Sequence, residues 1–331
     1  METKEITRTR GGAFLLQETH PENVFTPEDF SEEQRMMRDA VKEFIDREVW
    51  PNKHRFEQKD YDFTFELMRK AGELGFLGVS VPEAYGGLEM GFVSTMLVCD
   101  YFSGATGSLS TAYGAHTGIG IMPIVLYGTE EQKQKYVPKL ASGEEIGCYC
   151  LTEPGAGSDA NSGKTKAVLS EDGTHYKITG QKIWISNAGY ASVMIVFARI
   201  DDDKNITGFI VPNDPENGIS LGEEEHKLGI HASSTRQVFF SETKVPIKNM
   251  LSERGNGFKI AMNALNVGRI KLAVACIDAQ RRTVSESVHY ANERIQFKTP
   301  ISQFGAIKQK IANMATNCYV GESGCYRAAK D

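Results

Sequence analysis

The character of the sequence changes twice along the chain, and this order constrains the fold more than any other feature. Between residues 148 and 250, short apolar segments of strand type alternate with turn signals, among them "IGCYCLTE", "QKIWISN", "VMIVFARI" and "RQVFFSETKVP". Asp172-Gly173 predicts a hairpin with a type I′ turn, in which both central residues have positive φ. Short strands separated by such turns predict an antiparallel barrel or sandwich.

Helical patterns flank this segment on both sides. Before it, Ser31 with Gln34 and Thr129 with Gln132 have the spacing of capping boxes, each ahead of a helical pattern. After it, the apolar spacing from Gly257 predicts one very long helix, and a second begins near Ser302. The predicted fold class is therefore mixed α and β, with helices on either side of a β domain.

Composition narrows the class of protein. The 331 residues are 40% hydrophobic, which is ample for a core and for two or three domains. The formal net charge of −6 argues against a nucleic-acid-binding protein. No apolar run approaches the roughly 18–20 residues of a membrane span, and the N-terminus lacks the apolar core of a signal peptide. We therefore expect a cytoplasmic protein without a transmembrane segment.

The cysteines and histidines do not predict a metal site. None of the six cysteines forms a C-x-x-C pair, and the seven histidines lack metal-binding spacing. Cys148 and Cys150 are two residues apart on a predicted strand and so share one face. We expect them to be buried and to pack as small hydrophobic side chains.

Two segments suggest a ligand site. In "CLTEPGAGSD", the backbone N–H groups around Gly157 and Ser158 can form an anion-binding nest, although a purely structural turn also fits. No helix follows these glycines directly and no Gly-Lys-Ser/Thr occurs, so neither a Rossmann nor a Walker loop is predicted. In "GQKIWISNAG", Trp184 and Ser186 share one strand face, which suits a planar heteroaromatic ligand. A core Trp beside a surface Ser is the alternative.

Six motifs in fixed order extend this interpretation: "CLTEPGAGSD", "KIWISNAG", "HKLGIHASSTRQVFF", "VPIKNML", "GNGFKIAMNALNVGR" and "ANERIQF". They resemble the motifs of the acyl-CoA dehydrogenase family, flavin enzymes of fatty-acid β-oxidation, and "WISN" and "LNVGR" are most similar to the very-long-chain branch. The resemblance implies an N-terminal extension (1–26), an N-terminal all-α domain (27–147), a central antiparallel β-barrel or sandwich domain (148–250) and the first, incomplete part of a C-terminal α-helical bundle (251–331).

The resemblance also implies FAD as cofactor and acyl-CoA as substrate. The residues implied for FAD binding are Tyr149, Leu151, Thr152, Gly157, Ser158, Trp184, Ile185 and Ser186, together with Arg294, Gln296 and Phe297, which would reach the FAD of a neighbouring subunit. Those implied for substrate binding are Ser158, Asn266 and Arg269. The family reaction removes an α-proton and a β-hydride to give the trans-2-enoyl-CoA, and electrons pass to an electron-transfer flavoprotein.

The general base is the part of the family pattern that the sequence lacks. In most of the family it is a Glu in a downstream "YEGT"-like motif, and no such motif occurs here. A minority branch places it on the long helix just before the Arg, where this chain has Gly268. No catalytic residue is therefore assigned. We expect the Glu beyond residue 331, a chain truncated at its C-terminus, and little or no activity from this chain alone.

Three further expectations follow from the resemblance. Gly268 and the glycines at 114, 118 and 120 permit a roomy pocket, which fits a long acyl chain. The protein is expected to be a homo-oligomer, a dimer or a tetramer, in a bacterial cytoplasm or, if eukaryotic, in the mitochondrial matrix. An acyl-CoA oxidase and a non-catalytic assembly or scaffold protein of the same family are the alternative functions.

Overall fold

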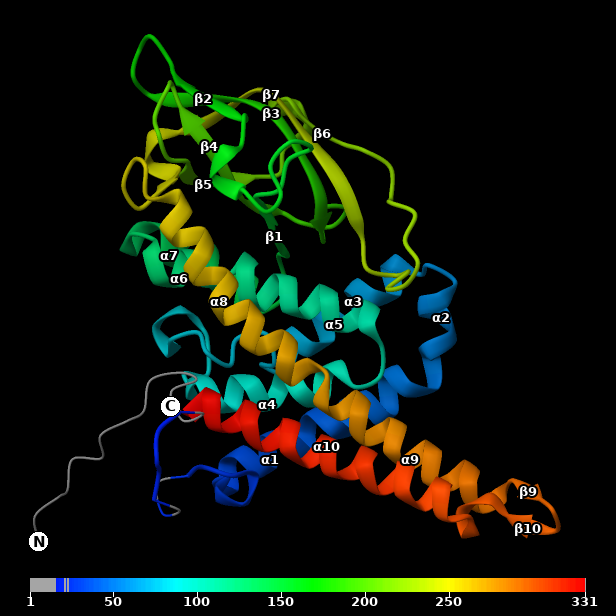
Figure 1. Cartoon of the computed structure of the whole chain (residues 1–331). Coiled ribbons are helices and arrows are strands. Elements are labelled where there is room, and N and C mark those ends of the chain that lie inside the picture. Colours follow the sequence, from blue (N-terminus) through cyan, green and yellow to red (C-terminus); the bar gives the residue numbers. More distant parts are fainter. Residues whose placement is uncertain (1–15, 21, 23, 331) are drawn as a thin grey trace, which may run out of the picture. The chain divides into compact units, whose positions relative to one another are not determined.

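The computed structural model describes residues 16–20, 22 and 24–330, which group into two compact units (Figure 1). The central unit comprises residues 48–90 and 106–269. The terminal unit comprises the described residues within 1–47, 91–105 and 270–331. The domain bounds expected from the sequence stay a prediction.

The central unit contains an eight-stranded sheet, which the described residues form in the order β6-β7-β3-β2-β4-β5-β8, with β1 added beside β4. The strands are β1 (Gly147–Cys150), β2 (Lys166–Leu169), β3 (His175–Ser186), β4 (Val193–Ile200), β5 (Thr207–Pro212), β6 (Ile219–Leu221), β7 (Thr235–Pro246) and β8 (Met250–Leu251). Most neighbours are antiparallel, as predicted, but β1 and β2 both run parallel to β4. The β domain is thus a mainly antiparallel sheet with two parallel pairings.

The hairpin between β2 and β3 forms where the sequence predicts it, but its turn differs. Only Gly173 has a positive φ (67°). The Asp172 carboxylate instead accepts hydrogen bonds from the Ser170 hydroxyl and from the Thr174 N–H and hydroxyl, at 2.6–3.1 Å. An Asp that bonds to neighbouring backbone in this way can hold a turn without adopting positive φ itself.

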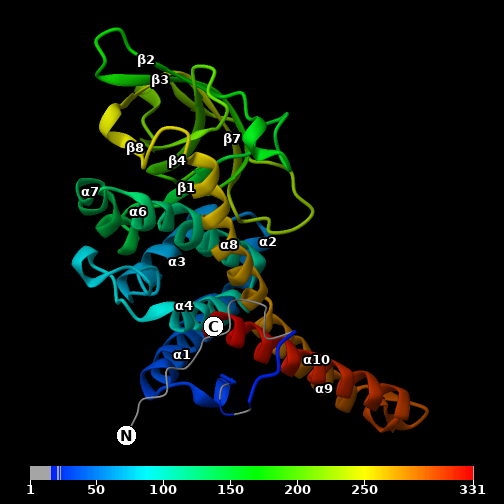
Figure 2. The ribbon, with the colours of Figure 1, turned by 60° about the vertical axis from the view of Figure 1, so that its left-hand side comes forward.

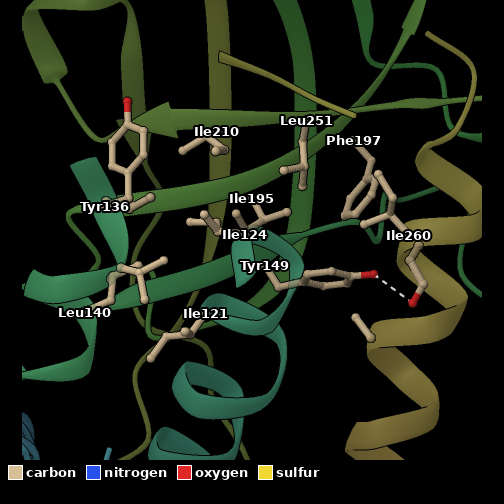
Figure 3. Close-up of a cluster of buried hydrophobic side chains, with 14 of the residues drawn as sticks. Ile121, Ile124, Tyr136, Leu140, Tyr149, Ile195, Phe197, Ile210, Leu251 and Ile260 are labelled. Carbon is tan, nitrogen blue, oxygen red and sulfur yellow. Dashed lines mark hydrogen bonds between the residues drawn. The ribbon is translucent and has the colours of Figure 1, made fainter. Parts of the chain in front are cut away.

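Helices cover one side of this sheet (Figure 1). The helical segments of the central unit before the sheet are η5 (Trp50–Asn52), α2 (Lys53–Glu57), α3 (Tyr61–Glu73), η6 (Glu83–Tyr85), α5 (Gly107–Gly114), the π-helical η7 (Ala115–Gly120), α6 (Met122–Tyr127) and α7 (Glu130–Ala141). Three short turns interrupt or follow the strands: η8 (Ala160–Ser162), η9 (Pro215–Asn217) and η10 (Ile247–Asn249). Ile124 of α6 and Leu140 of α7 pack against Ile195 of β4 in a buried apolar cluster (Figure 3).

A second apolar cluster lies within the sheet itself. Cys148 and Cys150 belong to it, both fully buried, with their sulfur atoms 3.8 Å apart. The expectation that these two thiols pack as small hydrophobic side chains is confirmed. The hydrogen bond with Cys150 and burial both raise the pKa of the Cys148 thiol, so this thiol stays protonated and unreactive.

The long helix predicted from Gly257 is interrupted. The structure shows α8 (Gly257–Ala275) and α9 (Ile277–Glu293) in succession, with a break at Cys276. Contrary to the sequence-based expectation, the stretch Gly257–Glu293 is long and apolar enough to cross a membrane, with a mean hydropathy of 1.4 over its best 18-residue window. A single such helix is weak evidence for a span, because core helices of water-soluble proteins meet the same criterion of length and composition.

The terminal unit is built from α1 (Glu32–Phe44), α4 (Gly91–Ser103), α9 and α10 (Gly305–Lys330), with the short η3 (Pro27–Asp29), η4 (Ile45–Val49, which leads out of the unit) and η11 (Ile301–Gln303). Helices α9 and α10 lie side by side and are joined through the hairpin of β9 (Ile295–Gln296) and β10 (Thr299–Pro300) (Figure 2). The buried Asp100 accepts hydrogen bonds from Arg281 and Tyr326, both at 2.8 Å, and so ties α4 to α9 and α10.

Both predicted capping boxes are confirmed. The Ser31 hydroxyl accepts from Gln34 N, and the Gln34 side chain accepts from Ser31 N, at the start of α1. Thr129 and Gln132 make the same exchange at the start of α7. The Gln132 amide additionally donates to the carbonyls of Lys248 and Met250 at 2.7 and 2.9 Å. This second cap therefore also attaches α7 to the end of the sheet.

Candidate functional site

A cavity of about 380 Å³ lies within the central unit. Four segments enclose it: η7, the end of β1 with the loop that follows, the end of β3, and the first half of α8. The lining residues are Ala115, Ile119, Tyr149, Leu151, Thr152, Gly157, Ser158, Ala160, Trp184, Ile185, Ser186, Met262, Leu265 and Arg269. The cavity thus collects two segments that the sequence singles out, "CLTEPGAGSD" and "KIWISNAG", although they are far apart along the chain.

The loop after β1 contributes Gly157 and Ser158 to the cavity lining. Glu153 and Ala156 exchange two backbone hydrogen bonds of 3.1 Å, which makes the tight turn. Beyond it, Gly157 and Ser158 are exposed, and within the described part of the chain their N–H groups have no acceptor. A Cβ built on Gly157 meets nothing within 4 Å. Two neighbouring free N–H groups beside open space are suited to a phosphate or another anion.

The wall from β3 is a bulge and not the regular strand face that the sequence predicts. The pairing of β3 with β7 shifts register between Lys182 and Ile185. Trp184 lies in this shift with a φ of 59°, an uncommon conformation for a bulky residue, and its side chain is 58% exposed. Trp184 and Ser186 both line the cavity. This arrangement differs from the alternative of a core Trp beside a surface Ser. Backbone strain of this kind is concentrated at functional sites.

Helix α8 provides the fourth wall and its charge. Met262, Leu265 and Arg269 recur at intervals that place them on one helix face, and all three line the cavity. Asn266 does not line it, but its side-chain oxygen accepts a hydrogen bond of 2.6 Å from the Arg269 guanidinium. Arg269 is the one charged residue among the described lining residues, which include no Asp, Glu or His.

Three residues expected at the FAD site lie elsewhere. Arg294, Gln296 and Phe297 belong to the terminal unit, at the end of α9 and in the β9–β10 hairpin, and they do not line the cavity. Phe297 is 90% exposed with a φ of 52° and makes an edge contact with Phe304. The expectation that these residues reach the FAD of another subunit stays a prediction.

Two functional candidates behind the cavity wall were not singled out by their sequence pattern. Lys182 is 1% exposed, and its ammonium lies 2.7 Å from the carboxylate of Glu153, which is 7% exposed. The one available signal is a Lys inside the apolar strand sequence "KIWI". Burial alone would raise the pKa of Glu153, but the Lys182 charge and hydrogen bonds from Thr165 and Lys164 lower it below its ordinary range.

Comparison with known proteins covers all three parts of the chain. The family models "Acyl-CoA dehydrogenase, N-terminal domain", "middle domain" and "C-terminal domain" match residues 31–144, 148–243 and 255–331. A probable acyl-CoA dehydrogenase of Bacillus subtilis is 47% identical over 327 residues, which are 99% of this chain and 54% of that protein. This chain thus spans about half the length of that relative.

Further relatives agree with this match. An acyl-CoA dehydrogenase of Bacillus subtilis is 38% identical over 90% of this chain and 79% of its own length. The mitochondrial very long-chain specific acyl-CoA dehydrogenase of Homo sapiens is 41% identical over 77% of this chain and 40% of its own length. The crystal structure of an acyl-CoA dehydrogenase complexed with FAD from Bacillus anthracis superposes with a TM-score of 0.93 at 47% identity, covering 97% of this chain and 56% of that one. This chain belongs to the acyl-CoA dehydrogenase family.

Proposed function

We propose that this chain forms the FAD- and acyl-CoA-binding part of an enzyme that dehydrogenates acyl-CoA between its α- and β-carbons. One observation carries the proposal: the anion-binding turn, the strained Trp184 and the Arg269 side chain all line one cavity inside one compact unit. The similarity to a family member crystallised with FAD supports the choice of cofactor.

The lining residues fit FAD by their chemistry. Leu151, Trp184 and Ile185 offer apolar surface for a flat ring system. Thr152 and Ser186 add hydroxyl groups for its polar edge. The free N–H groups of Gly157 and Ser158 suit the pyrophosphate. When bound, FAD supplies the acceptor for the hydride equivalent that leaves the β-carbon of the acyl chain.

The residues of this chain would bind and orient, while the base comes from elsewhere. Trp184 would cover the ring and exclude water, and the Thr152 and Ser186 hydroxyls would hold its orientation. Arg269, held by Asn266, would attract an anionic group of the substrate or a catalytic carboxylate. Because the described lining includes no carboxylate or imidazole, we propose that a Glu outside this lining abstracts the α-proton.

The finer parts of the proposal concern substrate and partners. A long acyl chain fits the absence of a side chain at Gly268, where a built Cβ meets only Ile119, at 3.9 Å. The proposed electron acceptor is an electron-transfer flavoprotein, and the proposed assembly is a homo-oligomer in the bacterial cytoplasm. The similarity to the very long-chain specific human enzyme supports the chain-length assignment.

FAD binding by the purified chain tests the proposal. We expect saturable binding, followed by flavin fluorescence and visible absorbance. The Ser186→Ala change should weaken it by about twofold to tenfold, the range for one lost hydrogen bond. Ser220→Ala, an exposed site on β6, is the matched control and should leave affinity unchanged. A folded chain that binds no FAD would contradict the proposal.

Turnover separates the candidate reactions. With FAD bound, we expect this chain to convert acyl-CoA at a rate at least about a hundredfold below that of a family member with its Glu in place, since general bases contribute ~10²–10⁴-fold. In a preparation that does reduce its flavin with acyl-CoA, slow reoxidation by air supports a dehydrogenase. Fast reoxidation by air without a carrier protein supports an oxidase.

A further inference from the structure

A buried ion pair lies directly behind the two main walls of the cavity. The Lys182 ammonium donates to three acceptors: the Glu153 carboxylate at 2.7 Å, the Phe197 carbonyl at 2.7 Å and the Leu151 carbonyl at 3.1 Å. These satisfy its three N–H donors. Lys182 does not itself line the cavity. Its side chain therefore reaches into the interior while the backbone that follows it forms the cavity wall.

The Glu153 carboxylate closes the loop that carries the anion-binding turn. It accepts hydrogen bonds from the N–H of Lys164 at 2.5 Å and of Thr165 at 3.1 Å, so it holds together residues 153 and 165. A built Cβ on Gly163 would come within 2.9 Å of this carboxylate. The loop between these ends includes Gly157 and Ser158. One carboxylate thus bonds the two ends of this loop to each other.

The same pair joins this loop to the bulge of β3. The Leu151 carbonyl accepts from Lys182, and the Thr152 carbonyl accepts from Ile183 N at 2.9 Å, so two successive residues of each segment are connected. Trp184 follows at once, in its left-handed conformation. Lys182 and Ile183 thus both connect the Leu151–Thr152 wall to the strand that carries the Trp184–Ser186 wall.

Stability alone does not explain such a pair. Removing two charges from water is expensive, and a well-packed apolar pair of similar volume is often as stable or more stable. What an ion pair with fully satisfied hydrogen bonds adds is a single defined geometry. Here that geometry is the relative position of two chain segments that meet at a ligand cavity.

We propose that Lys182 and Glu153 are positioning residues for the cofactor: they hold the two walls at the separation at which the flavin binds. The proposal rests on the proposed function, that this cavity binds FAD. Neither residue would touch the cofactor, so their effect should be seen in its affinity and in its absorption spectrum.

The test compares Lys182→Met, Glu153→Gln and the double variant with Lys177→Met. Lys177 is also on β3, where it makes an exposed 3.7 Å ion pair with Glu242 away from the cavity, so it is the matched control. We expect Lys182→Met to bind FAD at least tenfold more weakly and to shift the flavin absorbance, because it leaves a buried carboxylate unpaired. The double variant should recover part of the affinity, since the uncharged amide that replaces this carboxylate can still accept from Lys164 and Thr165.

Each outcome decides the matter. If Lys182→Met folds and binds FAD with the affinity and spectrum of Lys177→Met, the inference is wrong, even if its melting temperature is lower. If Lys182→Met does not fold, Glu153→Gln and the double variant are compared in the same way. If the unmodified chain binds no FAD, the proposed function fails. The inference about the cofactor then fails with it, and trypsin cleavage after Lys164 tests the ion pair alone: faster cleavage in Lys182→Met than in Lys177→Met would show that the pair still holds the loop closed, and equal rates would show that it does not.

Discussion

The hydroxyl of Tyr149 donates to the main-chain carbonyl of Ala261 at 3.3 Å and so joins β1 to α8 across the core of the central unit (Figure 3). Both elements line the cavity, and this bond is one of the contacts that fix their distance. The Tyr149 ring also packs edge-on against Phe197 of β4. Burial raises the pKa of Tyr149, so the phenol remains a neutral donor at any ordinary pH.

Tyr149→Phe removes this bond and leaves the ring in place. We expect the free energy of unfolding to fall by about 0.5–1.5 kcal/mol, the usual value of one internal hydrogen bond. Urea denaturation measures it. Tyr290→Phe, at a site 60% exposed in α9, is the control and should change stability by less than about 0.5 kcal/mol. Equal effects in both variants would show that the bond contributes nothing.

Gly157→Val separates binding from folding. The chain itself offers open space at this position and Gly157 is not at positive φ, so the fold should tolerate the side chain. The added atoms occupy space beside the anion-binding N–H groups, and we expect FAD to bind at least tenfold more weakly. Gly155→Val is the control, because Gly155 has equally open surroundings but does not line the cavity. Titration with FAD and urea denaturation of both variants check the two halves of this expectation.

Trp184→Gly tests whether backbone strain is retained for binding. Glycine adopts a φ of 59° without strain, so the substitution should remove about 1–3 kcal/mol of backbone strain. This gain offsets the packing that is lost with the Trp184 side chain, because this residue is already 58% exposed. The free energy of unfolding should stay within about 1 kcal/mol, while FAD affinity falls at least tenfold. Ile230→Gly relieves similar strain at a φ of 49° in a loop outside the lining. It should leave FAD affinity as it is, and a loss there would refute the local explanation.

Glu153 makes part of the stability dependent on pH. Its pKa is lowered in the folded chain, so the folded state binds fewer protons than the unfolded state in acid. The stabilisation is complete above the ordinary pKa of Glu, about 4.3, and is lost as the pH falls through the lowered value. Urea denaturation between pH 7 and pH 3 should show a smaller acid loss in Glu153→Gln than in the unmodified chain. Parallel curves would mean that folding does not lower the pKa of Glu153.

Sequence patterns that span only a few residues correctly predicted the helix caps and the side-by-side placement of two strand residues. The two capping boxes form because Ser31 and Thr129 each find their partner three residues away. The thiols of Cys148 and Cys150 lie side by side because strand residues two apart share a face. Where the outcome depended on backbone detail, as in the turn at Asp172 and the break at Cys276, the sequence pattern was less informative.

The parts of the site that were missed depend on contacts between distant residues. The bulge at Trp184 arises from the pairing of β3 with β7. In this pairing Ile185 lies opposite Arg236, which is more than 50 residues later in the chain. No local sequence pattern therefore reveals the bulge. Lys182 looks like an ordinary solvated charge until the Phe197 carbonyl and Glu153 are placed around it. The motif resemblance, by contrast, indicated most of the cavity lining, because three of the motifs supply most of its residues.

Every described residue that lines the cavity lies within one uninterrupted stretch, residues 115–269. The corresponding gene segment therefore carries the whole cavity, including the ion pair behind its walls. Recombination between related genes with crossovers outside this segment would pass the cavity on intact, while helices from another family member are joined on either side. The lining of the cavity can thus be inherited as a block, while the residues proposed to act from outside it would come with the flanking helices.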